Sequence, residues 1–146
     1  MTDILPFLKS LISVSGLSGY ESPVADLIIE KWRPLVDEIN ISRVGSLHGL
    51  KRGTGTSPRP SLMIATHMDA IGLRVSRIVD GFLHITRVGG IDVRVLPGAP
   101  VTVHASGSNE ELPGVIVLPP AHFLRESVGE KILIEHLLVD TGLLPR

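Results

Sequence analysis

Apolar residues recur at helical spacing in the amino-terminal part of the chain. Over residues 2–14 they lie three or four positions apart, which places them on one face of a helix: Ile4, Leu5, Leu8, Leu11 and Ile12. A Gly-rich break covers residues 15–20, and a second amphipathic helix is predicted to run to about Pro34. Ser18 and Glu21 have the spacing of a capping box for this second helix.

After the second helix the pattern changes from helical spacing to alternation. Apolar and polar side chains alternate over residues 38–44, and residues 46–51 can return as an antiparallel partner strand. A polar loop rich in Gly, Thr and Pro covers residues 52–60. The apolar run 62–65 follows, and it predicts a short buried strand that ends at His67.

Beyond residue 70 the sequence predicts short strands and no helix of ordinary length. Asp80-Gly81 is a hairpin signal between two alternating segments. Strands are expected at residues 71–75, 82–88, 101–104, 114–118 and 132–139. The change from helices and strands to short strands alone predicts two units with a boundary near residue 70.

Composition limits the classes of function. The 146 residues carry a formal net charge of −1 and no cysteine, which disfavours nucleic-acid partners and excludes disulfides and thiolate metal sites. No apolar run approaches the length of a membrane span, and the first sixteen residues lack a basic leader, so we expect a cytoplasmic protein without a secretory signal. The hydrophobic content of 43% indicates either strands buried on both faces or strands that pack against a partner or a missing segment.

The candidate functional residues are His67 and Asp69, which follow the apolar run 62–65. A neutral imidazole at the end of a strand suits a zinc or cobalt ion, and a carboxylate two residues later can fix the tautomer of the ring. Taken alone, the His-x-Asp motif is a weak signal, and its spacing favours a surface histidine beside a turn aspartate over a metal ligand.

Four segments together carry a resemblance to a known family. Residues 13–21, 62–73, 89–98 and 114–124 resemble the amino-terminal portion of the dinuclear metal aminopeptidases. The branch is that of glutamyl aminopeptidase and the tetrahedral aminopeptidases, which are often labelled endoglucanases. The segments occur in the family's order and extend across nearly the whole chain.

The resemblance implies an α/β fold class with two parts. Residues 1–69 would be the amino-terminal part of a helix-flanked mixed-sheet metallopeptidase domain. Residues 70–146 would be an inserted all-β, barrel-like dimerisation domain that is incomplete here, and through it the chain would form a homo-oligomer. The complete enzyme would bind two divalent metal ions, zinc or cobalt, and hydrolyse amino-terminal residues from peptide substrates.

Within this resemblance, His67 matches the first metal ligand and Asp69 the catalytic carboxylate that orients it. Ala70 stands where relatives commonly have Glu, which we expect to alter the loop rather than the metal. The family's other ligands, its bridging Asp and its Glu general base follow the inserted domain, and none can be placed on this chain. We therefore expect the 146-residue chain alone to be inactive and to bind metal at most weakly without the missing carboxy-terminal half.

The other histidines and Arg94 are interpreted from their neighbours in the sequence. His122, in a Pro-Pro-Ala-His run that resembles the family's Pro-Pro-His, is a candidate trans-subunit loop residue, with a strand-capping loop histidine as the alternative. Arg94 is predicted to pair with Asp92 rather than to hold substrate. The strand histidines are expected to be structural or solvated: His48, His84, His104 and His136.

Two further functional classes stay open at this point. One is a non-catalytic β-rich dimerisation or interaction module in which His67 has no metal. The other is an unrelated metal-dependent hydrolase of the amidohydrolase type, which predicts repeated strand–helix units after the motif. Residues 70–146 lack that repeat pattern.

Overall fold

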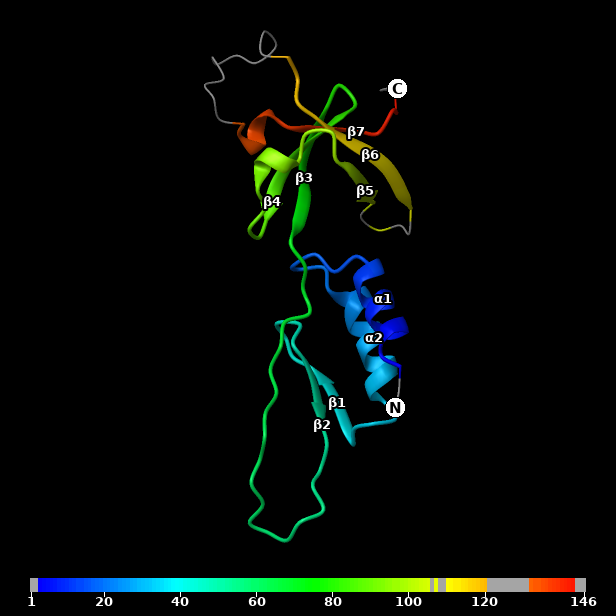
Figure 1. The fold of residues 1–146 in the computed structure, drawn as a ribbon, viewed down its shortest axis with the longest axis vertical. Coiled ribbons are helices and arrows are strands. Elements are labelled where there is room, and N and C mark those ends of the chain that lie inside the picture. The colour runs from blue at the N-terminus through cyan, green and yellow to red at the C-terminus, as the bar shows by residue number, and fades with distance from the viewer. Residues whose placement is uncertain (1–2, 106, 108–109, 121–131, 144–146) are drawn as a thin grey trace. The chain divides into compact units, whose positions relative to one another are not determined.

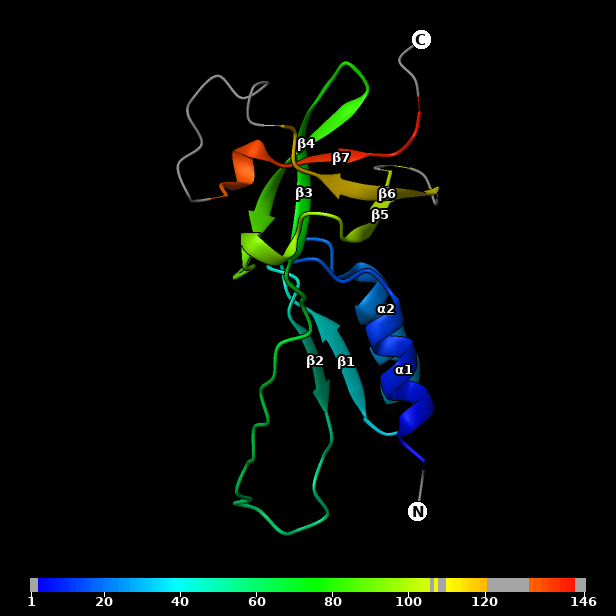
Figure 2. The same ribbon diagram turned by 45° about the horizontal axis from the view of Figure 1, so that its top comes forward.

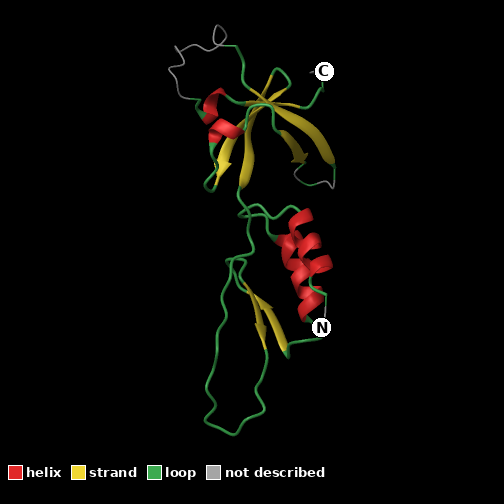
Figure 3. Cartoon of the chain, viewed as in Figure 1, coloured by secondary structure: helices red, strands yellow, loops and turns green. Residues whose placement is uncertain are grey.

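The chain divides into two compact units, Met1–Ala70 and Ile71–Arg146, each with its own sheet (Figures 1 and 3). The computed structural model describes residues 3–105, 107, 110–120 and 132–143. None of the helices in these described residues is long and apolar enough to cross a bilayer.

Two short helices form one side of the amino-terminal unit. Helix α1 covers Leu5–Ser13 and helix α2 covers Ser22–Trp32, and each has a proline in its first turn, where the missing N–H costs little. The predicted helices are therefore confirmed, but the predicted capping box is wrong. The helix begins at Ser22, so Glu21 is its N-cap residue rather than its third residue, and the Glu21 carboxylate accepts a hydrogen bond from the N–H of Gly19 at 2.7 Å.

A β-hairpin packs beside these helices (Figure 2). Strands β1 (Glu38–Ile41) and β2 (Leu47–Leu50) pair antiparallel, as the alternation predicts. Helix α2 approaches the hairpin so closely that a Cβ on Gly49 would lie 2.8 Å from the Trp32 ring. At the open end of the hairpin the N–H of Arg52 donates to Asp37 Oδ2 at 2.6 Å, which lowers the pKa of the Asp37 carboxyl.

The predicted buried strand at residues 62–65 is wrong for this chain. The segment has no regular secondary structure, and the exposed fractions of Leu62, Met63 and Ile64 are 88%, 87% and 82%. Among the described residues, no backbone hydrogen bond joins residues 61–66 to the rest of the chain. An apolar run becomes a buried strand only where neighbours pair its backbone and cover its faces, and the described part of the unit supplies none.

The carboxy-terminal unit is a five-stranded antiparallel sheet that curls into a half-barrel (Figures 1 and 2). The strand order is β3-β4-β7-β6-β5, which leaves β3 and β5 at the edges. The strands are β3 (Gly72–Val79), β4 (Phe82–Val88), β5 (Pro100–His104), β6 (Glu111–Val117) and β7 (Leu138–Asp140).

Two predictions in this unit have different outcomes. The Asp80-Gly81 hairpin is confirmed, because both residues have positive φ (52° and 83°) and Val79 pairs with Phe82. The strand predicted at 132–139 is only partly correct, because Ile134–His136 forms a 3-10 turn before β7. That turn lets Leu137 reach the core before the chain pairs with its neighbours.

The core of the carboxy-terminal unit is small and lies between its central strands. Ile116 on β6 is fully buried and Leu137 is 1% exposed. They pack with Leu83, Ile85 and Val139. The sheet is close-packed here, since a Cβ on Gly114 would lie 2.7 Å from a methyl of Val139.

We predict that Ile116→Ala lowers the free energy of unfolding by about 2–5 kcal/mol, because it removes fully buried methyl groups and leaves a cavity. The matched control is Val115→Ala on the same strand, where 44% exposure predicts a loss below about 1 kcal/mol. Urea denaturation of both variants measures the difference. Equal losses would contradict the assignment of the core.

Candidate functional site

The His-x-Asp motif lies in the last residues of the amino-terminal unit. Ala70, directly after Asp69, forms a parallel bridge with Leu17 in the loop between α1 and α2. Its N–H donates to the carbonyl of Gly16 at 2.7 Å, and its carbonyl accepts from the N–H of Ser18 at 3.2 Å. The chain is therefore anchored immediately after the motif, whereas residues 61–66 before it are not.

His67 and Asp69 contact each other through one ring nitrogen. Nδ1 of His67 lies 3.1 Å from Asp69 Oδ1 and 3.0 Å from the Asp69 carbonyl oxygen. The carboxylate therefore occupies Nδ1 and leaves Nε2 as the ring nitrogen able to bind an ion. The His67 side chain is 86% exposed, so solvent reaches that nitrogen. This arrangement fits the predicted ligand and its orienting carboxylate, whose roles at a metal stay predictions.

The ligand set around His67 is incomplete in the described part of the chain. No group of three His, Cys, Asp or Glu side chains that could hold a metal ion occurs among the described residues. Catalytic zinc commonly takes three protein ligands and keeps one position open. His67 can thus supply one ligand, and the described residues do not by themselves form a metal centre.

The other histidines are His122, the candidate loop residue, and the strand histidines that are expected to be structural or solvated. His122 lies outside the described residues. Nδ1 of His104 lies 3.4 Å from Glu111 Oε1 across the β5–β6 pair. Burial and, to a smaller degree, the Arg77 guanidinium lower the pKa of His84.

Arg94 forms an ion pair with Asp92, as predicted. The guanidinium donates to both carboxylate oxygens, with Nη2 2.6 Å from Oδ2 and Nε 3.0 Å from Oδ1. Asp92 Oδ1 also accepts from the N–H of Arg94 and so caps the 3-10 turn Val93–Val95. These contacts lower the pKa of Asp92 to about 2, and they leave Arg94 engaged within its own loop.

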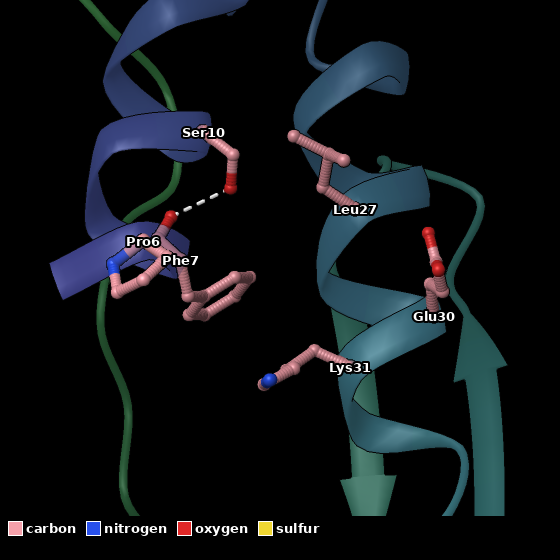
Figure 4. A pocket seen from close by; sticks show the side chains of 6 residues that line it. All are labelled: Pro6, Phe7, Ser10, Leu27, Glu30 and Lys31. Atoms are coloured by element: carbon pink, nitrogen blue, oxygen red, sulfur yellow. Dashed lines mark hydrogen bonds between the residues drawn. The ribbon is translucent and has the colours of Figure 1, made fainter. Parts of the chain in front are cut away.

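Among the described residues, two of the shallow cavities each lie within one unit, and neither of these two includes His67 or Asp69. The first has a volume of about 310 Å³ and lies between α1 and α2. Figure 4 shows the side chains that line it: Pro6, Phe7, Ser10, Leu27, Glu30 and Lys31. The ammonium of Lys31 lies 5.7 Å from the centre of the Phe7 ring, and Ser10 donates to the Phe7 carbonyl. The second cavity, of about 230 Å³, lies in the carboxy-terminal unit beside Arg77, His84 and Glu135. Sequence spacing missed both, because each is lined by residues from separate elements.

The chain is similar to known aminopeptidases over nearly all of its length. Residues 45–146 match the family described as M42 glutamyl aminopeptidase. A lysyl aminopeptidase of Pyrococcus furiosus is 32% identical over 139 residues, which are 92% of this chain and 38% of the relative.

Solved structures of aminopeptidases also match nearly the whole chain. The TET aminopeptidase of a marine sediment archaeon, Thaumarchaeota archaeon SCGC AB-539-E09, matches 96% of this chain and 38% of its own, with a TM-score of 0.82 and 27% identity. The Pyrococcus horikoshii TET1 peptidase, which can assemble into a tetrahedron or a large octahedral shell, matches 97% of this chain and 41% of its own, with a TM-score of 0.77 and 30% identity. The chain thus spans about two fifths of the length of its relatives.

We predict that Arg94→Gln raises the pKa of Asp92 from about 2 toward the ordinary value of 3.8, because the guanidinium is the main group that stabilises the carboxylate. The lowered pKa means that this pair stabilises the folded loop above pH 3.8, and that the contribution is lost as the pH falls toward 2. Carboxyl-carbon NMR titration of both proteins measures the change. An unchanged Asp92 pKa in the variant would contradict the ion pair.

Proposed function

We propose that this chain, which belongs to the M42 glutamyl aminopeptidase family, is the amino-terminal portion of a metal-dependent aminopeptidase that removes amino-terminal residues from peptides. The observation that carries the proposal is the His67–Asp69 contact, in which a carboxylate holds Nδ1 and leaves Nε2 for a metal. It occurs in a chain that matches aminopeptidases over more than nine tenths of its own length.

Each of the two residues has a defined task in this proposal. His67 binds one divalent ion, zinc or cobalt, through Nε2, and Asp69 fixes the tautomer and orientation of the ring through Nδ1. The bound ions of the complete enzyme supply Lewis acidity toward the peptide carbonyl and the attacking water. The other ligands and the general base come from a carboxy-terminal segment that corresponds to the part of the relatives beyond this chain.

The two units have separate roles in the proposal. Residues 1–69 contribute to the catalytic domain, and residues 70–146 form the assembly domain through which the protein oligomerises. The described part of the half-barrel presents exposed apolar side chains on and next to its edge strand β3, and apolar surface beside an unpaired strand edge favours association. The exposed apolar side chains on and next to β3 are Val75, Ile78, Val79 and Phe82.

We predict that light scattering of the purified chain at micromolar concentration gives a mass above 15.7 kDa. Ile78→Lys on the edge strand should lower the mass without unfolding the sheet, because this side chain is 67% exposed. A monodisperse monomer with no binding of a hydrophobic dye would contradict the assembly role of the carboxy-terminal unit.

A chimera tests the catalytic proposal. In it, Arg146 is followed by the part of the Pyrococcus furiosus lysyl aminopeptidase that this chain does not match. We predict that the chimera retains divalent metal after dialysis and hydrolyses aminoacyl anilides, whereas the free chain does neither. Metal analysis and a chromogenic anilide panel measure both properties.

Point variants of the chimera test the two residues. His67→Ala should lower kcat/KM by more than about 100-fold because it removes a metal ligand, and Asp69→Asn should weaken metal binding by about 10- to 100-fold. His48→Ala, an exposed histidine on β2, is the matched control and should leave both properties unchanged. An active His67→Ala chimera would exclude the proposed ligand. A folded chimera that retains no metal and hydrolyses no anilide would favour the non-catalytic interaction module.

A further inference from the structure

Two departures from regular strand structure meet beside β4 in the carboxy-terminal unit. A β-bulge in β3 places Ser76 and Arg77 together opposite His84 on β4, because a bulge sets two residues against one. The 3-10 turn Ile134–His136 also contacts β4, and it carries Glu135 (Figure 1). Irregular backbone at two places thus brings four polar side chains to one part of the sheet.

These four side chains and Ile85 line the cavity of about 230 Å³ described above. The Ser76 hydroxyl donates to the His84 carbonyl at 3.1 Å. Nη2 of Arg77 lies 3.5 Å from Nδ1 of His84, and Nδ1 is the acceptor because a guanidinium can only donate. Burial and, to a smaller degree, the Arg77 charge lower the pKa of His84, so the ring is mostly neutral near pH 7 and carries its proton on Nε2.

Arg77 and Glu135 bring opposite charges to this cavity without neutralising each other. No ion pair joins them, and among the described residues neither forms an ion pair with any other side chain. A purely anionic ligand would face the Glu135 carboxylate, and a purely cationic ligand would face the Arg77 guanidinium. The complementary ligand therefore carries both a carboxylate and an ammonium group.

We propose that this cavity binds a free α-amino acid in its zwitterionic form. The α-carboxylate accepts from the Arg77 guanidinium and from Nε2–H of His84, and the α-ammonium donates to the Glu135 carboxylate. Ile85 adds apolar surface, which suits an aliphatic side chain, and a volume of about 230 Å³ limits the ligand to a small molecule. The inference goes beyond the proposed function and does not rest on it, because it depends only on groups within the carboxy-terminal unit.

Ligand-observed NMR titration of the 146-residue chain with leucine tests the proposal, with EDTA present so that metal-bound leucine does not contribute. We expect a dissociation constant of about 1 mM or below. Two analogues each lack one charge: 4-methylpentanoate has no ammonium, and 3-methylbutylamine has no carboxylate. Each should bind at least about 10-fold more weakly than leucine, because it leaves one charged wall without a partner. Absence of leucine binding at about 10 mM, or equal binding of leucine and either analogue, would overturn the proposal.

Variants that remove one charge assign the binding to the two walls. Arg77→Gln should weaken leucine binding at least about 10-fold and remove its advantage over 3-methylbutylamine. Glu135→Gln should weaken it similarly and remove its advantage over 4-methylpentanoate. Arg74→Gln alters an exposed arginine on the same strand that does not line the cavity, and this matched control should leave all three affinities unchanged. Equal effects of Arg77→Gln and Arg74→Gln would overturn the proposal.

A measurement on the unaltered chain keeps the proposal falsifiable if a variant does not fold. In amide-detected NMR spectra, leucine should shift the resonances of Arg77, His84 and Glu135 and leave those of helices α1 and α2 in place. Shifts confined to the cavity between α1 and α2, or to His67 and Asp69, would place the bound amino acid elsewhere and overturn the proposal.

Discussion

The structure depends on one constraint: a strand is stable only where neighbouring backbone pairs its edges and side chains cover its apolar faces. In the carboxy-terminal unit, β4, β7 and β6 meet this condition for one another and enclose Ile116 and Leu137. In the described part of the amino-terminal unit the hairpin β1–β2 is paired, while the apolar residues 62–64 are not. The segment that leads to His67 thus has neither backbone partners nor a covered apolar face among the described residues.

The same constraint links fold to chemistry. The Asp69 carboxylate already holds Nδ1 of His67, so the ring can be oriented by residues two positions apart in the sequence. A metal centre also needs ligands that converge from separate elements, and the described residues contain no such group. The described residues therefore contain the local part of the proposed site, the His67–Asp69 contact, and not the further ligands that a metal centre needs.

Sequence reasoning predicted the elements whose determinants are local. The spacing in residues 2–14, the Asp80-Gly81 turn and the Asp92–Arg94 pair each depend on residues a few positions apart, and the structure contains all three. It was wrong where the outcome depends on distant residues or on fine backbone geometry. Residues 62–65 have the composition of a buried strand but no neighbours to bury them, and Ile134–His136 turns so that Leu137 can fill the core. The predicted capping box is wrong because helix α2 begins at Ser22, which makes Glu21 the N-cap residue, and because the N–H of Ser18 donates to the Ala70 carbonyl instead.

A crystal structure of the chimera grown with zinc, with diffraction data collected at the zinc absorption edge, tests most directly whether His67 binds the metal. We expect an anomalous peak about 2.0–2.1 Å from Nε2 of His67, with the Asp69 carboxylate still on Nδ1. An ion bound through Nδ1, or a fully loaded zinc site that does not include His67, would contradict it.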